Sequence, residues 1–125
     1  EKELVCIRQT SQQIKKHSLI LINEILASTS EEDGTAIAAD VIRVFAHTSS
    51  NIIFVTHLYD LADMAATGKL TLPEGERAVS LITERLQQHE GGRSVTYHII
   101  PGKPLKDIWE KNLIDKYIAG VNGAM

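Results

Sequence analysis

Two pairs of polar residues follow two short apolar segments of the sequence. Asn23 and Glu24 end the stretch "SLILINE", and Thr56 and His57 end the stretch "NIIFVTH". If these stretches are neighbouring strands of a parallel sheet, the four side chains lie at its carboxyl edge, where such sheets bind ligands. A carboxylate there can orient an attacking water, an oxygen donor can hold a water of Mg²⁺, and a histidine can contact a phosphate. This set of groups suits the hydrolysis of a nucleoside triphosphate.

Each of these groups also has a structural interpretation. A strand that leaves a hydrophobic core often ends in polar residues, and a histidine near a helix start is more often structural than phosphate-binding. Ser30, followed three residues later by Asp33, matches a capping box at the start of a helix. The residues alone leave both interpretations open, and both roles can coexist in one loop.

Apolar patterns along the chain predict the elements that would position these groups. Apolar residues spaced three or four apart indicate helices, and short continuous apolar runs indicate buried strands of a parallel sheet. The predicted helices are 1–16, about 32–47, 58–66, a stretch from Ala78 that stops at Gly91, and 105–117; the predicted strands are 18–23, 51–57 and 94–100. Their order indicates a layered α/β architecture in one domain.

The composition excludes several classes of function. No apolar run approaches the ~20 residues of a membrane helix and the first residues lack a signal-peptide pattern, so we expect a cytoplasmic chain without a membrane partner. The net charge is −3, and the 13 Lys and Arg are scattered along the chain. This distribution argues against a DNA-binding surface. The single cysteine, Cys6, excludes an internal disulfide. No Gly-x-x-x-x-Gly-Lys-Ser/Thr phosphate loop is present, so a phosphate cradle would lie outside these residues.

The stretch "LILINEILASTSEEDG" resembles the Walker B strand and the following loop of the MutS family of DNA mismatch-repair ATPases. The family pattern is an apolar strand, Asp-Glu-Ile, three variable residues, Thr-Ser, two residues and Asp-Gly. The stretch "VTHLYDL" resembles the family's Ala-Thr-His-aromatic-x-Glu-Leu segment, which carries a switch histidine, and "TYHIIPGKP" and "IAGVN" resemble later segments more loosely. The residues in register with the first pattern are Glu24, Ile25, Thr29, Ser30, Asp33 and Gly34.

The resemblance implies a fold and two catalytic roles. Residues 1–125 would be the C-terminal portion of a three-layer P-loop NTPase domain of the ABC type, with a mainly parallel sheet flanked by helices. Glu24 would orient the hydrolytic water, and His57 would sense the γ-phosphate. ATP and Mg²⁺ would be cofactors of the full-length parent.

The resemblance also implies partners. Two ATPase domains of this family pair head to tail, so the loop containing Thr29, Ser30 and Asp33 would face the nucleotide of a second subunit, which we expect to be another copy. Other domains of the parent would bind mismatched or branched DNA.

Three departures from the family pattern indicate a divergent MutS-related protein. Asn23 stands where the family usually has Asp, so its contact with Mg²⁺ through water would be weakened and hydrolysis slowed. Residues 26–28 replace the common Gly-Arg-Gly, and residues 110–112 replace Ser-Tyr-Gly. We expect no ATP hydrolysis by these 125 residues alone, because the phosphate loop is missing.

Two alternatives remain from the sequence. The chain could be an ATPase segment of another ABC-type protein, although "TSQQIKKH" stands where transporters carry Leu-Ser-Gly-Gly-Gln. It could also be a non-catalytic α/β interaction module in which Asn23 and Glu24 are structural.

Overall fold

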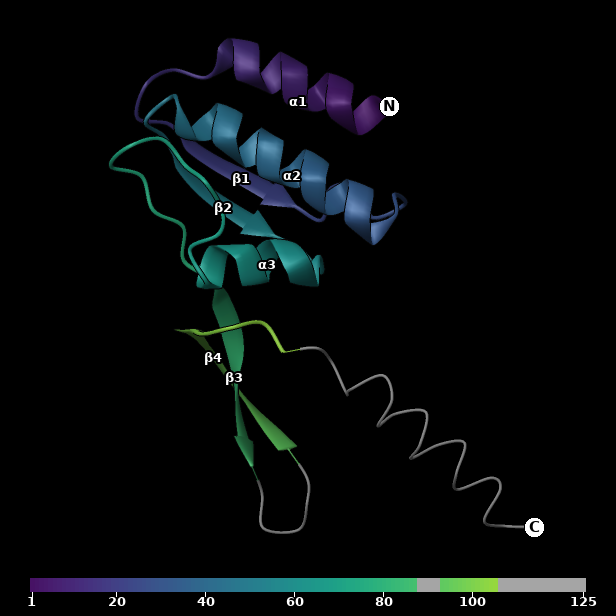
Figure 1. Ribbon diagram of the computed structural model, residues 1–125, viewed down its shortest axis with the longest axis vertical. Coiled ribbons are helices and arrows are strands. Elements are labelled where there is room, and N and C mark those ends of the chain that lie inside the picture. The colour runs from purple at the N-terminus through teal and green to yellow at the C-terminus, as the bar shows by residue number, and fades with distance from the viewer. Residues whose placement is uncertain (88–92, 106–125) are drawn as a thin grey trace, which may run out of the picture.

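The computed structural model describes residues 1–87 and 93–105 of the chain. Figure 1 shows the N-terminal helix and the last two strands at opposite ends of the long axis. The described elements are, in order, α1 (Lys2–Gln13), β1 (Leu19–Asn23), α2 (Glu31–Ala46), β2 (Asn51–Val55), α3 (Tyr59–Ala66), β3 (Leu81–Gln87) and β4 (Arg93–Pro101). The first five agree in type with the sequence predictions and differ from them only at their ends. The helix expected over 105–117 lies outside the described residues, apart from Leu105.

Strands β1 and β2 form a two-stranded parallel sheet, with Leu19 opposite Asn51 and Asn23 opposite Val55. The side chains of β1 alternate between two faces, and Ile20 and Ile22 are buried. They form a cluster with Val41 and Phe45 of α2, and with partly buried residues Ile7 and Ile14 of the N-terminal segment. Helices α1 and α2 therefore contribute to the core on the same face of the sheet.

The opposite face of this sheet is open. Leu19, Leu21, Ile53 and Val55 point to it and are between 51% and 69% exposed. The sequence predicted a buried strand here. The strand and its parallel pairing are confirmed, but the described residues place helices against one face alone, so β1 is buried on that face only. The arrangement seen is two layers, and the third layer of the predicted fold stays a prediction.

Helix α2 begins where the sequence offers a cap. The Ser30 hydroxyl accepts a hydrogen bond from the Asp33 backbone N–H at 3.3 Å and donates one to the Asp33 carboxylate at 2.9 Å. The capping interpretation of this pair is confirmed. Beyond the cap, Ala38 packs in a second buried cluster with Leu58 and Leu61 at the start of α3.

Strands β3 and β4 form an antiparallel hairpin where a helix was expected. The spacing of Ala78, Leu81, Ile82 and Leu86 predicted an amphipathic helix, and that prediction was wrong. The segment Leu81–Gln87 pairs along its length with Arg93–Pro101. A short apolar stretch fits either period, and cross-strand pairing decides between them. The strand predicted over 94–100 is confirmed, with β3 as its partner.

The hairpin contains an irregularity between Thr83 and Arg85, where the register shifts. The Glu84 carboxylate accepts a hydrogen bond from the Thr96 hydroxyl at 2.8 Å and lies 3.3 Å from Nδ1 of His98. Between these two partners, Tyr97 has a φ of 62° and is 90% exposed. The irregularity therefore directs an aromatic ring into solvent.

Candidate active site

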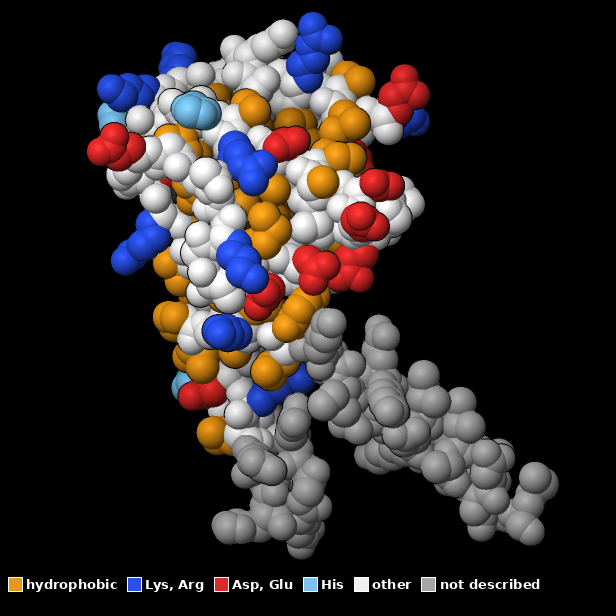
Figure 2. Space-filling model, in the orientation of Figure 1, with side chains coloured by type: hydrophobic (Ala, Val, Ile, Leu, Met, Phe, Trp, Pro, Cys, Tyr) orange, Lys and Arg blue, Asp and Glu red, His pale blue; other side chains and the backbone are white. Residues whose placement is uncertain are grey.

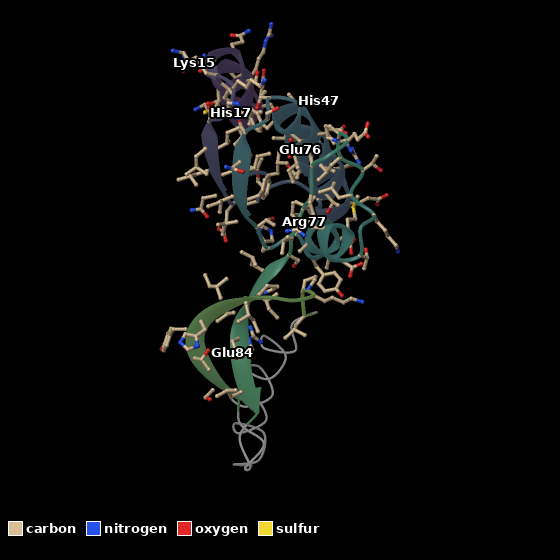
Figure 3. The ribbon with its side chains drawn as sticks, turned by 90° about the vertical axis from the view of Figure 1, so that its left-hand side faces the viewer. Lys15, His17, His47, Glu76, Arg77 and Glu84 are labelled. Atoms are coloured by element: carbon tan, nitrogen blue, oxygen red, sulfur yellow. The ribbon has the colours of Figure 1, made fainter. Side chains whose placement is uncertain are left out.

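The carboxyl ends of β1 and β2 meet through a backbone hydrogen bond. The Glu24 N–H donates to the Val55 carbonyl at 2.8 Å, which extends the parallel ladder by one residue. Thr56 and His57 follow Val55 directly. The structure therefore brings the two polar segments singled out in the sequence to one edge of the sheet. Figure 3 shows Lys15, His17 and His47 at the other end of the strands, away from this edge.

The side chains of Asn23, Glu24 and His57 are exposed. Within residues 1–87 and 93–105, these three side chains make no hydrogen bond or ion pair. The same residues contain no group of three or more His, Cys, Asp and Glu side chains placed to hold a metal. A magnesium ion bound with a nucleotide keeps several waters and takes one or two protein oxygens together with the phosphates. An exposed amide oxygen such as that of Asn23 fits that donor set without a preformed cluster.

The turn after β1 is left-handed at two non-glycine residues. Glu24 has a φ of 47° and Leu26 a φ of 66°. Such a conformation costs roughly 1–2 kcal/mol per residue and persists where surrounding contacts fix it. The Leu26 side chain is 4% exposed and packs in the cluster that contains Leu58. Burial of Leu26 thus anchors the turn that carries Glu24.

Glu3 is a second anchor of this turn, and no pattern in the sequence indicates it. Its Oε2 accepts a hydrogen bond from the Leu26 N–H at 2.9 Å, across 23 residues of sequence. Glu3 and Asn23 also line one open groove of about 220 Å³ between α1 and β1. An acid in the first turn of a helix ordinarily indicates a favourable interaction with the helix dipole, so only the structure identifies this contact.

The loop from Thr29 to Asp33 leads from this turn into α2. The Thr29 N–H donates to the Leu26 carbonyl at 3.0 Å, and Ser30 and Asp33 are engaged in the helix cap. Figure 2 shows acidic side chains on the right of the view, where Figure 1 places the start of α2. The first turn of α2 itself carries Glu31, Glu32 and Asp33. These carboxylates interact favourably with the helix dipole, so this helix start offers no free positive end to a phosphate.

The turn after β2 fixes the backbone around His57. The Thr56 hydroxyl accepts a hydrogen bond from the Leu58 N–H at 3.0 Å, and the Leu58 side chain is 1% exposed. With Thr56 bonded and Leu58 in the core, the intervening His57 projects from the surface. Its side chain is exposed next to the carboxyl edge of the sheet, where Glu24 also lies.

The structure thus shows a parallel sheet covered by helices on one face, with polar residues at the adjacent carboxyl ends of its strands. This arrangement is typical of α/β domains that bind ligands at that edge of the sheet. The family comparison makes this assignment specific. Residues 1–103 match the sequence model of MutS domain V, a P-loop ATPase domain, and the chain belongs to this family. The resemblance to the MutS family seen in the sequence is confirmed.

One relative extends this result. Over 63 residues the chain is 40% identical to the probable DNA mismatch repair protein Msh6 of Drosophila melanogaster. The aligned segment is 48% of this chain and 5% of that relative, so the chain spans a small part of the protein it matches. No solved structure matches the chain. In the part of the chain that the structure describes, none of the helices has the length and hydropathy to cross a membrane.

Proposed function

We propose that the chain is the C-terminal portion of a mismatch-repair ATPase domain, in which Glu24 orients the hydrolytic water and His57 contacts the γ-phosphate. The observation that carries this proposal is the hydrogen bond from the Glu24 N–H to the Val55 carbonyl. It joins the strand ending in a carboxylate to the strand followed by a histidine. Glu24 and His57 therefore lie at one edge of the sheet, from which a water-positioning carboxylate and a phosphate-contacting histidine can act on the same nucleotide.

Asn23 is the proposed partner of the magnesium that accompanies ATP. When bound, Mg²⁺ neutralises phosphate charge in the transition state. The Asn23 amide oxygen would hold a water of the ion but lacks the negative charge of a carboxylate. This position therefore holds the ion more weakly than an aspartate would.

The loop around Thr29, Ser30 and Asp33 is the proposed contact with a second ATPase subunit, a further copy of this chain. Ser30 and Asp33 are exposed while they cap α2, so the cap leaves the outer side of the loop accessible. DNA binding, to mismatched or branched structures, is assigned to other domains of the parent, because the basic residues here are scattered.

The test uses the full-length polypeptide that contains this chain and its phosphate loop. Glu24→Ala is expected to lower kcat for ATP by at least about 10²-fold, because general-base assistance typically contributes 10²–10⁴-fold. Binding of ATP, measured with a fluorescent analogue, stays within about twofold of the parent. Glu74→Ala is the control, because it removes an exposed carboxylate from the loop between α3 and β3. Parental turnover by Glu24→Ala would favour the non-catalytic interaction module.

A second variant tests Asn23. Asn23→Asp restores a carboxylate at the magnesium position and is expected to lower the Mg²⁺ concentration that gives half-maximal ATPase activity by about tenfold, since hard cations prefer charged oxygen ligands. The measurement is a Mg²⁺ titration at fixed ATP. An unchanged titration curve would remove Asn23 from the proposed site.

A further inference from the structure

Glu3 connects the N-terminal helix to the turn that carries Glu24. It lies in the first turn of α1, and its Oε2 accepts the hydrogen bond from the Leu26 N–H at 2.9 Å in a partly buried position. Helix α1 has no fully buried residue of its own. This bond is therefore a specific polar contact in a region where α1 is otherwise held by partial burial of side chains such as Ile7.

The turn needs such a contact because its backbone is strained. Both Glu24 and Leu26 have positive φ and carry a Cβ, which makes this conformation unfavourable without outside support. Two hydrogen bonds from other parts of the chain hold it. The Val55 carbonyl binds the N–H of Glu24, and the Glu3 carboxylate binds the N–H of Leu26.

Loss of the Glu3 carboxylate would leave the Leu26 N–H without its acceptor in a partly buried place. An unpaired buried N–H is unfavourable, and a bond to a charged acceptor is stronger than one to a neutral group. The turn would then relax toward a backbone conformation that exposes this N–H to water. Only Ile25 separates Leu26 from Glu24, so such a change alters the direction of the Glu24 side chain.

We propose that Glu3 is a positioning residue for Glu24. It holds the Leu26 N–H and thereby keeps the left-handed turn in the conformation that presents Glu24 at the carboxyl edge of the sheet. In this role Glu3 acts through the turn and is not a catalytic residue. The inference rests on the proposed function, in which Glu24 orients the hydrolytic water.

The test separates the reach of the Glu3 side chain from its charge. In the full-length polypeptide, Glu3→Gln keeps an acceptor oxygen at the same reach, whereas Glu3→Asp keeps the charge on a shorter side chain. Glu3→Asp and Glu3→Ala are expected to lower kcat for ATP roughly 10- to 100-fold with KM nearly unchanged, since a misplacement of about 1 Å can lower a rate on the order of 10²-fold. Glu3→Gln is expected to retain kcat within about threefold of the parent, because a neutral amide oxygen still accepts the bond, though more weakly.

The matched control is Glu1→Ala. It removes the same charge from the same end of α1, where the side chain of Glu1 makes no capping hydrogen bond. Glu1→Ala is expected to keep the parental kcat. A loss of kcat in Glu1→Ala equal to that of Glu3→Ala would assign the effect to charge near α1 and overturn the inference.

A second readout does not depend on activity. Hydrogen exchange of the peptide that contains Leu26 is expected to be faster in Glu3→Ala and Glu3→Asp, and parental in Glu3→Gln. The inference is overturned by a protected Leu26 amide in Glu3→Ala, by parental kcat in both Glu3→Ala and Glu3→Asp, or by a raised KM with unchanged kcat. If Glu24→Ala retains parental turnover, the proposed function is wrong whatever the Glu3 variants do. The hydrogen-exchange measurement then still decides whether Glu3 holds the turn.

Discussion

The parallel layer and the β3–β4 hairpin use their apolar residues in opposite ways. Both buried clusters of the described structure consist of residues between Ile20 and Leu70, from β1, the turn after it, α2 and the segment around α3. In the hairpin, Leu81, Leu86 and Ile99 are each more than half exposed, at 60%, 53% and 70%. Burial therefore stabilises one region far more than the other.

The hairpin is instead held by its backbone ladder and by polar contacts. Glu84 binds Thr96 and lies beside His98, and at its base the Gly102 N–H donates to the Ser80 carbonyl at 3.0 Å. A net hydrogen bond contributes roughly 0.5–1.5 kcal/mol, whereas a fully buried aliphatic side chain contributes about 1.5–3 kcal/mol. The two pairs of strands thus owe their stability to different interactions, and the same substitution should have unequal effects in them.

The largest contrast is expected from one substitution made in both regions. Ile20→Ala removes a side chain that is 6% exposed, and Ile99→Ala removes one that is 70% exposed. Ile20→Ala should lower the free energy of unfolding by about 2–5 kcal/mol, and Ile99→Ala by less than about 0.5 kcal/mol. Urea denaturation followed by circular dichroism measures both. Equal losses would mean that the hairpin is packed against something in solution.

A smaller contrast concerns the two regions' left-handed residues. Leu26→Gly relieves roughly 1–2 kcal/mol of backbone strain but deletes a buried side chain, so we expect a net loss of about 1–3 kcal/mol. In Tyr97→Gly the strain relief is opposed by about 0.5–1 kcal/mol of glycine entropy, and the exposed ring that is removed does not belong to the core. The stability of this variant should stay within about 1 kcal/mol of the parent. Thermal unfolding of the two variants distinguishes them, and a large loss in Tyr97→Gly would contradict the comparison.

The smallest difference in the free energy of unfolding is expected between two variants that each lose one hydroxyl group. Ser30→Ala removes the cap of α2 and should lower the free energy of unfolding by about 1 kcal/mol. Thr96→Ala removes a partly buried hydrogen bond to the Glu84 carboxylate in the hairpin and should lower it by a similar amount, about 0.5–1.5 kcal/mol. Ser30→Asp is the control for the cap, because a carboxylate also accepts the backbone N–H. If Ser30→Asp were as destabilising as Ser30→Ala, the cap would not be the cause.

The sequence predicted the parallel layer well, because its signals are local. The apolar runs before Asn23 and Thr56 have the length and composition of buried strands, and Ser30 with Asp33 is a capping pattern within one turn. The polar residues that follow the two runs indicated the carboxyl edge of the sheet, and the motif that contains Glu24, Ser30 and Asp33 indicated the MutS family. The roles of Glu24 and His57 stay predictions until activity is measured.

The sequence did not predict the β3 strand or the contact of Glu3 with the turn after β1, because both depend on residues far away in the sequence. Residues 81–87 satisfy a helical spacing, and only pairing with β4 makes them a strand. Glu3 is one of 16 acidic residues, and nothing in its neighbourhood marks it as the acceptor for Leu26. The left-handed φ of Leu26 is equally hidden, because leucine has no preference for that conformation.

The bond between Glu3 and Leu26 also has a consequence for the order of folding. It closes a loop of 23 residues, whereas the Ser30 cap joins residues three apart. Loop-closure entropy rises with separation, so local contacts form before distant ones. We therefore expect α2 to begin at Ser30 while the preceding turn is still loose, and the direction of the Glu24 side chain to be fixed only when α1 docks.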